Sequence, residues 1–196
     1  MRPLAAMVPL LLAAAITPGP NNLLMLRIGL ESGLRAVPAP ATGVVLGGLT
    51  MLLVSRAGLA LAFGAHPSLP ALMRVLGAGG VAWLGVRLVW ESFGKPTARS
   101  LKMRACGVLG MFLFQFVNPK AWLVVLTVVA ARSGPPSTSI ASLTALFIVI
   151  PYGCLLLWAA GGALAATLLR EPRARAWLDR ASGALLALSA AVLVLP

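Results

Sequence analysis

Residues 17–22 read Thr-Pro-Gly-Pro-Asn-Asn, and residues 118–122 read Asn-Pro-Lys-Ala-Trp. Each stretch interrupts a long apolar segment with proline and free amide groups, and the second adds a positive charge. Such groups are costly inside a bilayer because no water is present to satisfy them. We call these stretches the first break and the second break, and we expect the functional residues of the chain to lie there.

The composition is that of a membrane protein. Of 196 residues, 60% are hydrophobic and 10% are charged, with a mean hydropathy of +0.96. A soluble domain carries charge on about a quarter of its residues. Lys and Arg account for 16 charges against 4 from Asp and Glu, but they are dispersed between apolar runs instead of forming one basic face. This dispersal argues against nucleic-acid binding.

Six apolar segments follow one another along the chain. They cover about Leu4–Leu30, Ala39–Phe63, Leu69–Trp90, Ala105–Ala131, Thr138–Leu169 and Trp177–Leu195, with the first and fourth interrupted by the breaks and the fifth bent at Pro151. Each is long enough as a helix to cross a hydrocarbon core of about 30 Å. We therefore predict an all-α polytopic protein with six transmembrane helices, of which the first and fourth are broken.

The basic residues predict the orientation. The connections after segments one, three and five hold 11 of them: Arg27, Arg35, Arg87, Lys95, Arg99, Lys102, Arg104, Arg170, Arg173, Arg175 and Arg180. The opposite side has only Arg2, Arg74 and Arg132. By the positive-inside rule the first side is cytoplasmic, so both termini are expected in the periplasm.

The spacing of the segments suggests an internal repeat. Pro18 and Pro119 lie 101 residues apart, and the same offset carries segments two and three onto segments five and six. Three spans per repeat invert the second repeat relative to the first, as in many secondary transporters. We expect one transporter domain over residues 1–196, with repeats at about 4–92 and 105–196.

Both breaks combine a helix-capping residue with a proline. Thr17 precedes Pro18 and Asn118 precedes Pro119, the arrangement of an N-cap followed by the first helical position. Each break therefore predicts the start of a half-helix, and the inverted repeat makes the two starts meet near mid-membrane. Facing helix N-termini favour an anion, and Lys120 adds a full charge.

A zwitterionic ligand fits these groups. A carboxylate suits the helix starts and Lys120, while neutral side chains offer donors and acceptors for an amino group. The candidate substrate-binding residues are Thr17, Pro18, Gly19, Asn21, Asn22, Gln115, Asn118 and Lys120. The alternative is that the prolines only kink two transmembrane helices.

Other candidate chemistry is scarce. His66 is the only histidine, Cys106 and Cys154 form no metal-binding motif, and no Ser/His/Asp set or HExxH motif is present. We expect no catalytic residues, no metal and no cofactor. Arg56 lies too deep in segment two to reach the membrane surface easily, so it either helps hold the substrate or caps carbonyls freed at a break.

The breaks and several other residues carry a family resemblance. They are residues 17–22 and 118–122, Gly33 with Arg35, Gly43, Gly47, Gly58-Leu59, Gly77-Ala78 and Leu84-Gly85. In these the sequence resembles the LysE/RhtB family of bacterial amino-acid exporters. The spacing of Gln115 and Asn118 is similar to that in the cysteine and O-acetylserine exporters. The resemblance implies a six-span inner-membrane carrier that exports small neutral or basic amino acids or their derivatives, driven by the proton-motive force. The paired breaks and Lys120 favour alternating access, and the lipid bilayer and a homo-oligomer are further expected partners.

The sequence also departs from this family. Gly48 stands where many relatives have an acidic residue, Gly80 where they have an aromatic one, and Arg56 where they are apolar. Proton coupling would then use Lys120, a peripheral carboxylate such as Glu31, or the substrate itself. Two alternative functions remain. One is a channel. The other is a membrane-embedded protein that handles thiols or metals or assists assembly, and this second function requires Cys106 or Cys154.

Overall fold

The computed structural model describes residues 2–55, 107–130 and 140–168, with single residues and short stretches between 72 and 93 and between 176 and 191. Every regular element among these residues is helical. In chain order the elements are α1 (Arg2–Ile16), α2 (Pro20–Ser32), η1 (Leu34–Ala36), α3 (Pro38–Val54), α6 (Val108–Val117), α7 (Pro119–Ala130) and α8 (Ile140–Leu168). The predicted all-α class is confirmed.

The long helices have the length and composition of membrane spans. Among the described residues, Leu34–Val54 and Ala141–Leu168 are each long and apolar enough to cross a bilayer. Two further candidates are bent pairs: α1 meets α2 at 55°, and α6 meets α7 at 72°. The described helices thus supply up to four of the six predicted spans, including both broken ones. The third and sixth predicted spans fall largely outside the described residues.

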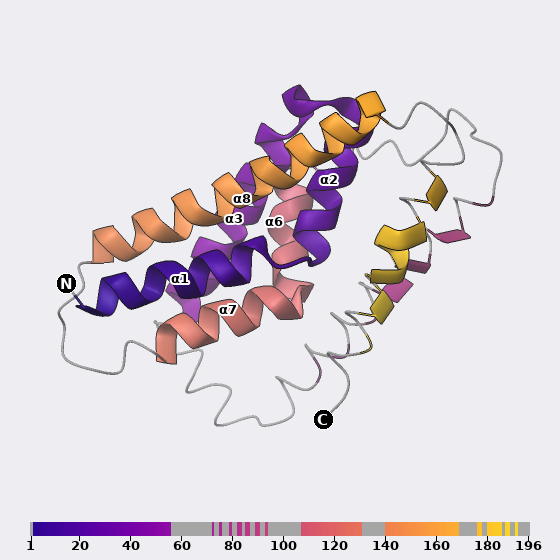
Figure 1. The fold of residues 1–196 in the computed structure, drawn as a ribbon. Helices are drawn as coiled ribbons and strands as arrows, with labels where there is room; N and C mark the ends of the chain where they lie inside the picture. Colours follow the sequence, from indigo (N-terminus) through magenta and orange to yellow (C-terminus); the bar gives the residue numbers. More distant parts are fainter. Residues whose placement is uncertain are drawn as a thin grey trace.

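The helices pack around two apolar clusters. α8 lies alongside α1 and also contacts α2, while α3 packs against α6 (Figure 1). One cluster joins α1, α3, α7 and α8 through side chains such as Leu11, Met51 and Val125. The other joins α2, α3, α6 and α8 through side chains such as Met25, Met111 and Leu155. The breaks between α1 and α2 and between α6 and α7 fall where one cluster gives way to the other.

Glycines allow the closest helix contacts. A Cβ atom on Gly43 would overlap the carbonyl oxygen of Val108, and one on Gly47 would lie 2.8 Å from that of Phe112, so α3 and α6 touch through their backbones. In the same way, a Cβ atom on Gly162 of α8 would overlap the Leu26 carbonyl of α2. Small residues at helix interfaces are typical of membrane bundles, where close packing replaces the hydrophobic effect.

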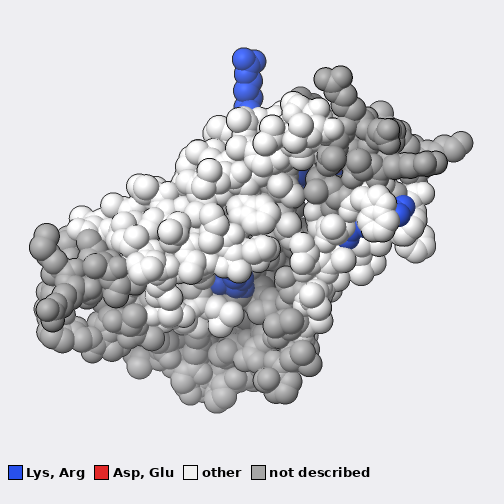
Figure 2. All heavy atoms as spheres, viewed as in Figure 1, with Lys and Arg blue, Asp and Glu red and all other residues white. Residues whose placement is uncertain are grey.

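The outer surface of the described helices is largely apolar. Large side chains on α3, α6 and α8 are well exposed, including Leu53, Leu109 and Val149. Figure 2 shows few Lys or Arg and no Asp or Glu among the described residues on the face it views. An apolar surface of this extent is suited to lipid and not to water.

Candidate functional site

The second break is a short, locally capped turn. α6 ends at Val117, α7 begins at Pro119, and only Asn118 lies between them, in an extended conformation. Asn118 Oδ1 accepts a hydrogen bond from the backbone N–H of Lys120 at 3.1 Å. Trp122 Nε1 donates to the Phe116 carbonyl at 2.8 Å across the turn. The predicted capping of a half-helix by Asn118 and Pro119 is therefore confirmed.

The first break is longer, and its helix start was predicted at the wrong residue. α1 ends at Ile16, and α2 begins at Pro20 with Gly19 as its N-cap, not with Thr17 and Pro18. The Thr17 hydroxyl donates back to the Ala13 carbonyl in α1 and so is not available to cap α2. Pro18 and Pro20 both suit the first helical position, so the sequence alone allowed two helix starts that differ by two residues.

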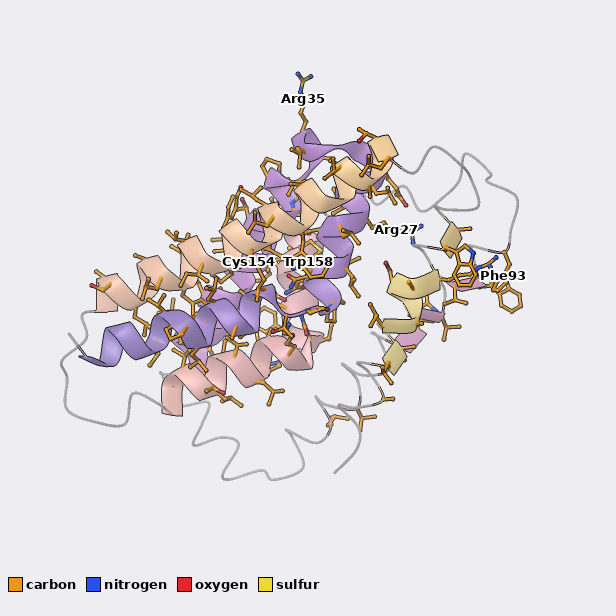
Figure 3. The ribbon with its side chains drawn as sticks, viewed as in Figure 1. Arg27, Arg35, Phe93, Cys154 and Trp158 are labelled. Atoms are coloured by element: carbon orange, nitrogen blue, oxygen red, sulfur yellow. The ribbon has the colours of Figure 1, made fainter. Side chains whose placement is uncertain are left out.

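Side chains from other elements satisfy the carbonyls that the first break leaves free. The buried amide of Asn22 in α2 donates to the carbonyls of Ala15 at 2.7 Å and Thr17 at 2.8 Å. Trp158 of α8 lies close to the end of α1 (Figure 3), and its Nε1 donates to the Ile16 carbonyl at 3.2 Å. Side chains of α2 and α8 therefore satisfy backbone carbonyls that the end of α1 leaves free.

Lys120 connects the two breaks. Its ammonium donates to the carbonyl of Thr17 at 2.5 Å and approaches that of Pro18 at 3.4 Å. A Cβ atom on Gly19 would lie 2.9 Å from Lys120 Cδ, so the glycine leaves room for the lysine stem. The starts of α2 and α7, 99 residues apart in sequence, are thus neighbours.

Three amide side chains form a cluster beside this connection. Gln115 Oε1 accepts from Asn21 Nδ2 at 2.9 Å and lies 3.4 Å from Asn118 Nδ2. Gln115 Nε2 donates to the Val44 carbonyl of α3 at 3.0 Å, which fixes the orientation of the amide. Within the described part of the chain, Asn21 Oδ1 is buried with no donor assigned to it. A buried acceptor of this kind is suited to an amino group.

A cavity of about 90 Å³ lies between the breaks. Its polar lining comes from Asn21, Asn22, Gln115, Asn118 and Lys120, with Gly19 and Pro20 beside them. Its apolar lining includes Leu11, Val44, Gly48, Val125, Phe147 and Leu155. At about 10–15 Å³ for each water-sized group, this space is suited to a small molecule.

Six of the eight predicted site residues line this cavity: Gly19, Asn21, Asn22, Gln115, Asn118 and Lys120. Thr17 and Pro18 lie beside it and contribute the carbonyls that hold Lys120. Arg56 falls outside the described residues. The apolar lining was not predicted, because residues such as Val44 and Phe147 look like ordinary core positions in the sequence.

The described residues contain no group of three His, Cys, Asp or Glu side chains that could hold a metal. Cys154 is buried in α8, and Cys106 falls outside the described part of the chain. Glu31, a peripheral carboxylate, accepts from Arg27 Nε at 2.5 Å one helical turn away. Among the described residues, the cavity is lined by one ionisable side chain, that of Lys120.

Comparison with known proteins gives a family match over most of the chain. The sequence profile of the LysE type translocators matches residues 12–196. The chain is 34% identical over 76 residues to a leucine efflux protein of Enterobacter sp. (strain 638), covering 39% of this chain and 36% of the relative. It is 30% identical over 119 residues to an uncharacterized membrane protein of Pseudomonas aeruginosa, covering 57% of this chain and 55% of the relative.

A longer match is to a cysteine/O-acetylserine efflux protein of Shigella flexneri, 29% identical over 177 residues, which covers 84% of this chain and 89% of the relative. The chain thus spans about a third and about half of the first two relatives but most of this one. No solved structure matches the chain.

Proposed function

Because the chain belongs to the LysE type translocator family, we propose that it is a secondary transporter that exports small amino acids or their derivatives. The family consists of membrane transporters and not of enzymes. Its relatives named for efflux of leucine and of cysteine or O-acetylserine support a substrate with an α-amino-acid core. The apolar helices and the bacterial relatives place the protein in the inner membrane.

The observation that carries the proposal is the cavity between the two half-helix starts. An ammonium has three donors, and the carbonyls of Thr17 and Pro18 accept from two of them in Lys120. The third donor and the first turn of α2 can bind a substrate carboxylate. Asn21 Oδ1, buried without a donor among the described residues, can accept from the substrate amino group. A simple proline kink would require neither the lysine nor this amide cluster.

The helix contacts support two inverted repeats. Adding 101 to the residue numbers of α3 gives residues that lie almost entirely in α8, and subtracting 101 from those of α6 gives residues of α1. The two helices of the α3–α6 pair pack against each other, and so do those of the α8–α1 pair. By the same offset, the residues that correspond to Gly43 and Val108, which are in contact, are Thr144 and Met7. Met7 and Leu143, the residue before Thr144, belong to one apolar cluster. We therefore retain six spans, periplasmic termini and alternating access about this site as parts of the proposal.

Substrate binding would change the contact that joins the breaks. A carboxylate that binds the third ammonium donor is a stronger partner for Lys120 than a backbone carbonyl, so the ammonium would then shift toward it and away from Thr17. The contact between the first break and α7 would then loosen, which provides a route from binding to rearrangement.

The proton-motive force is the proposed driving force, with Lys120, Glu31 and the substrate amino group as the candidate proton carriers. A homo-oligomer remains part of the proposal.

Export of labelled amino acids from loaded membrane vesicles tests this function. Lys120→Ala should lower the rate about 10- to 150-fold, the factor that corresponds to about 1.5–3 kcal/mol for a hydrogen bond to a charged group. Asn118→Ala should also lower it. Arg35→Ala is the matched control, because Arg35 is exposed and points away from the helices in Figure 3. Unchanged export in both site variants would contradict the proposed site.

A further inference from the structure

Three glycines of α3 differ in what surrounds them. Gly43 and Gly47 face the backbone of α6 so closely that neither can carry a side chain without moving that helix. Gly48 is different, because a Cβ atom there would meet only the ring of Phe147, at 3.2 Å from Cε1 and 4.0 Å from Cζ. Contact with the α6 backbone therefore explains the first two glycines, whereas Gly48 packs against a single side chain, the Phe147 ring of α8. Glycine at this position costs about 1 kcal/mol relative to alanine inside a helix.

Gly48 belongs to the apolar lining of the cavity. Phe147 of α8, which packs against Gly48, belongs to the same lining, as do Leu11 of α1 and Leu155. The polar groups lie close by, since Gln115 packs against Gly47 and donates to the Val44 carbonyl of the same helix. An amino acid whose charged groups lie among the amides and Lys120 would therefore direct its side chain toward Gly48 and Phe147.

The charge of the lining limits what that side chain can be. Among the described residues Lys120 is the one charged residue that lines the cavity, and no carboxylate does so. Among these described lining residues a basic side chain would meet no carboxylate and would be repelled by the ammonium, while an acidic one would be desolvated against apolar groups.

We propose that Gly48 and Phe147 form the side-chain pocket of the transport site and select amino acids with uncharged, largely apolar side chains. Gly48 and the Phe147 ring packed against it both line the cavity, so together they set the largest side chain that fits. This inference rests on the proposed function and narrows its substrate class.

The test uses the full-length protein in proteoliposomes, with labelled alanine, leucine and lysine transported in separate assays. Gly48→Ala adds one methyl group to the pocket, so the leucine-to-alanine rate ratio should fall about tenfold or more, the usual discrimination for one methylene. Phe147→Leu should raise the ratio, and Gly48→Ala with Phe147→Leu should return it toward the wild-type value, because Phe147 is the neighbour that the new methyl group meets. Lysine should be transported poorly by all of these proteins.

Gly153→Ala is the matched control, since it also introduces alanine into a helix but has nothing within 4 Å of the new Cβ atom. Its leucine-to-alanine ratio should equal that of the wild type. An unchanged ratio in Gly48→Ala, with wild-type transport of alanine, would overturn the pocket and leave the proposed function intact. Efficient lysine transport by the wild type would overturn the assigned substrate class. A wild-type protein that transports none of the three would overturn the proposed function and the pocket with it.

Discussion

Each of the two breaks ends one helix and starts another, but they are stabilised in different ways. The second break has one residue between its helices, and the side chain of that residue, Asn118, caps the helix that follows. The first break has three residues between its helices and a glycine cap without a side chain. Its free carbonyls are satisfied by Asn22 of α2 and by Lys120 and Trp158 of two other helices, α7 and α8.

Because of this difference, the stability of each break depends on different parts of the molecule. The second break is a local structure that needs only the residues around it. The first break depends on the surrounding helices, and one of its donors, Lys120, also lines the proposed substrate cavity. The first break is therefore the one whose stability can respond to substrate, because binding competes for a group that holds it.

The largest effect on stability is expected from Asn22→Ala. This change removes the donor to two carbonyls, those of Ala15 and Thr17, at a buried position. The Thr17 carbonyl keeps its bond to Lys120, but that of Ala15 loses the Asn22 donor. An unsatisfied buried polar group costs about 1–3 kcal/mol, so the free energy of unfolding should fall by about that amount. Thermal unfolding in detergent, monitored by the fraction of folded protein, measures this loss. A melting temperature equal to that of the wild type would show that the first break does not depend on the Asn22 side chain.

A smaller effect is expected from Asn118→Ala. Loss of the N-cap hydrogen bond to Lys120 should lower the free energy of unfolding by about 1 kcal/mol. Asn118→Ser, which keeps a capping oxygen, should restore most of this loss in the same assay. If Asn118→Ala were less stable than Asn22→Ala, the side chain at the second break would contribute more to stability than that at the first, contrary to this prediction.

The smallest effect is expected from Thr17→Val. The Thr17 hydroxyl bonds to the carbonyl of Ala13, four residues earlier, and only the backbone of Thr17 touches Lys120. Valine has the same shape and keeps that backbone, so export should stay within about twofold of the wild type, as for a substitution outside the site. Thr127→Val is the matched control, because that hydroxyl also bonds to the carbonyl four residues earlier, at 2.7 Å from Leu123. A large loss in Thr17→Val alone would return its hydroxyl to the substrate site.

The sequence predicted the helices and the breaks well because both have local causes. Apolar length defines a span, and Asn118 before Pro119 defines a cap whatever surrounds it. The start of α2 was missed by two residues because Thr17 bonds back to α1, a choice between two local hydrogen bonds that sequence alone does not decide. The predicted spans three and six and the role of Arg56 stay predictions, since they lie largely or wholly outside the described residues.

The polar end of the site was also predictable, and its apolar end was not. Lys120 and the amides stand out because polar groups are rare in such segments. Gly48 and Phe147 do not, since an interior glycine and a buried phenylalanine are ordinary in a helix bundle. The contact of Lys120 with Thr17 could not be foreseen either, because it depends on how the two broken helices meet.

Recognition of a substrate carboxylate by Lys120 is the central feature of the proposed site. The decisive measurement is the affinity of the purified protein for the amino acid that it transports fastest, compared with the amide of that amino acid, in the wild type and in Lys120→Met. We predict that the wild type prefers the amino acid by about tenfold or more, the effect of one hydrogen bond to a charged group, and that Lys120→Met binds the two alike. Arg35→Met should keep the wild-type preference. A Lys120→Met protein that still distinguishes acid from amide as the wild type does would contradict the account.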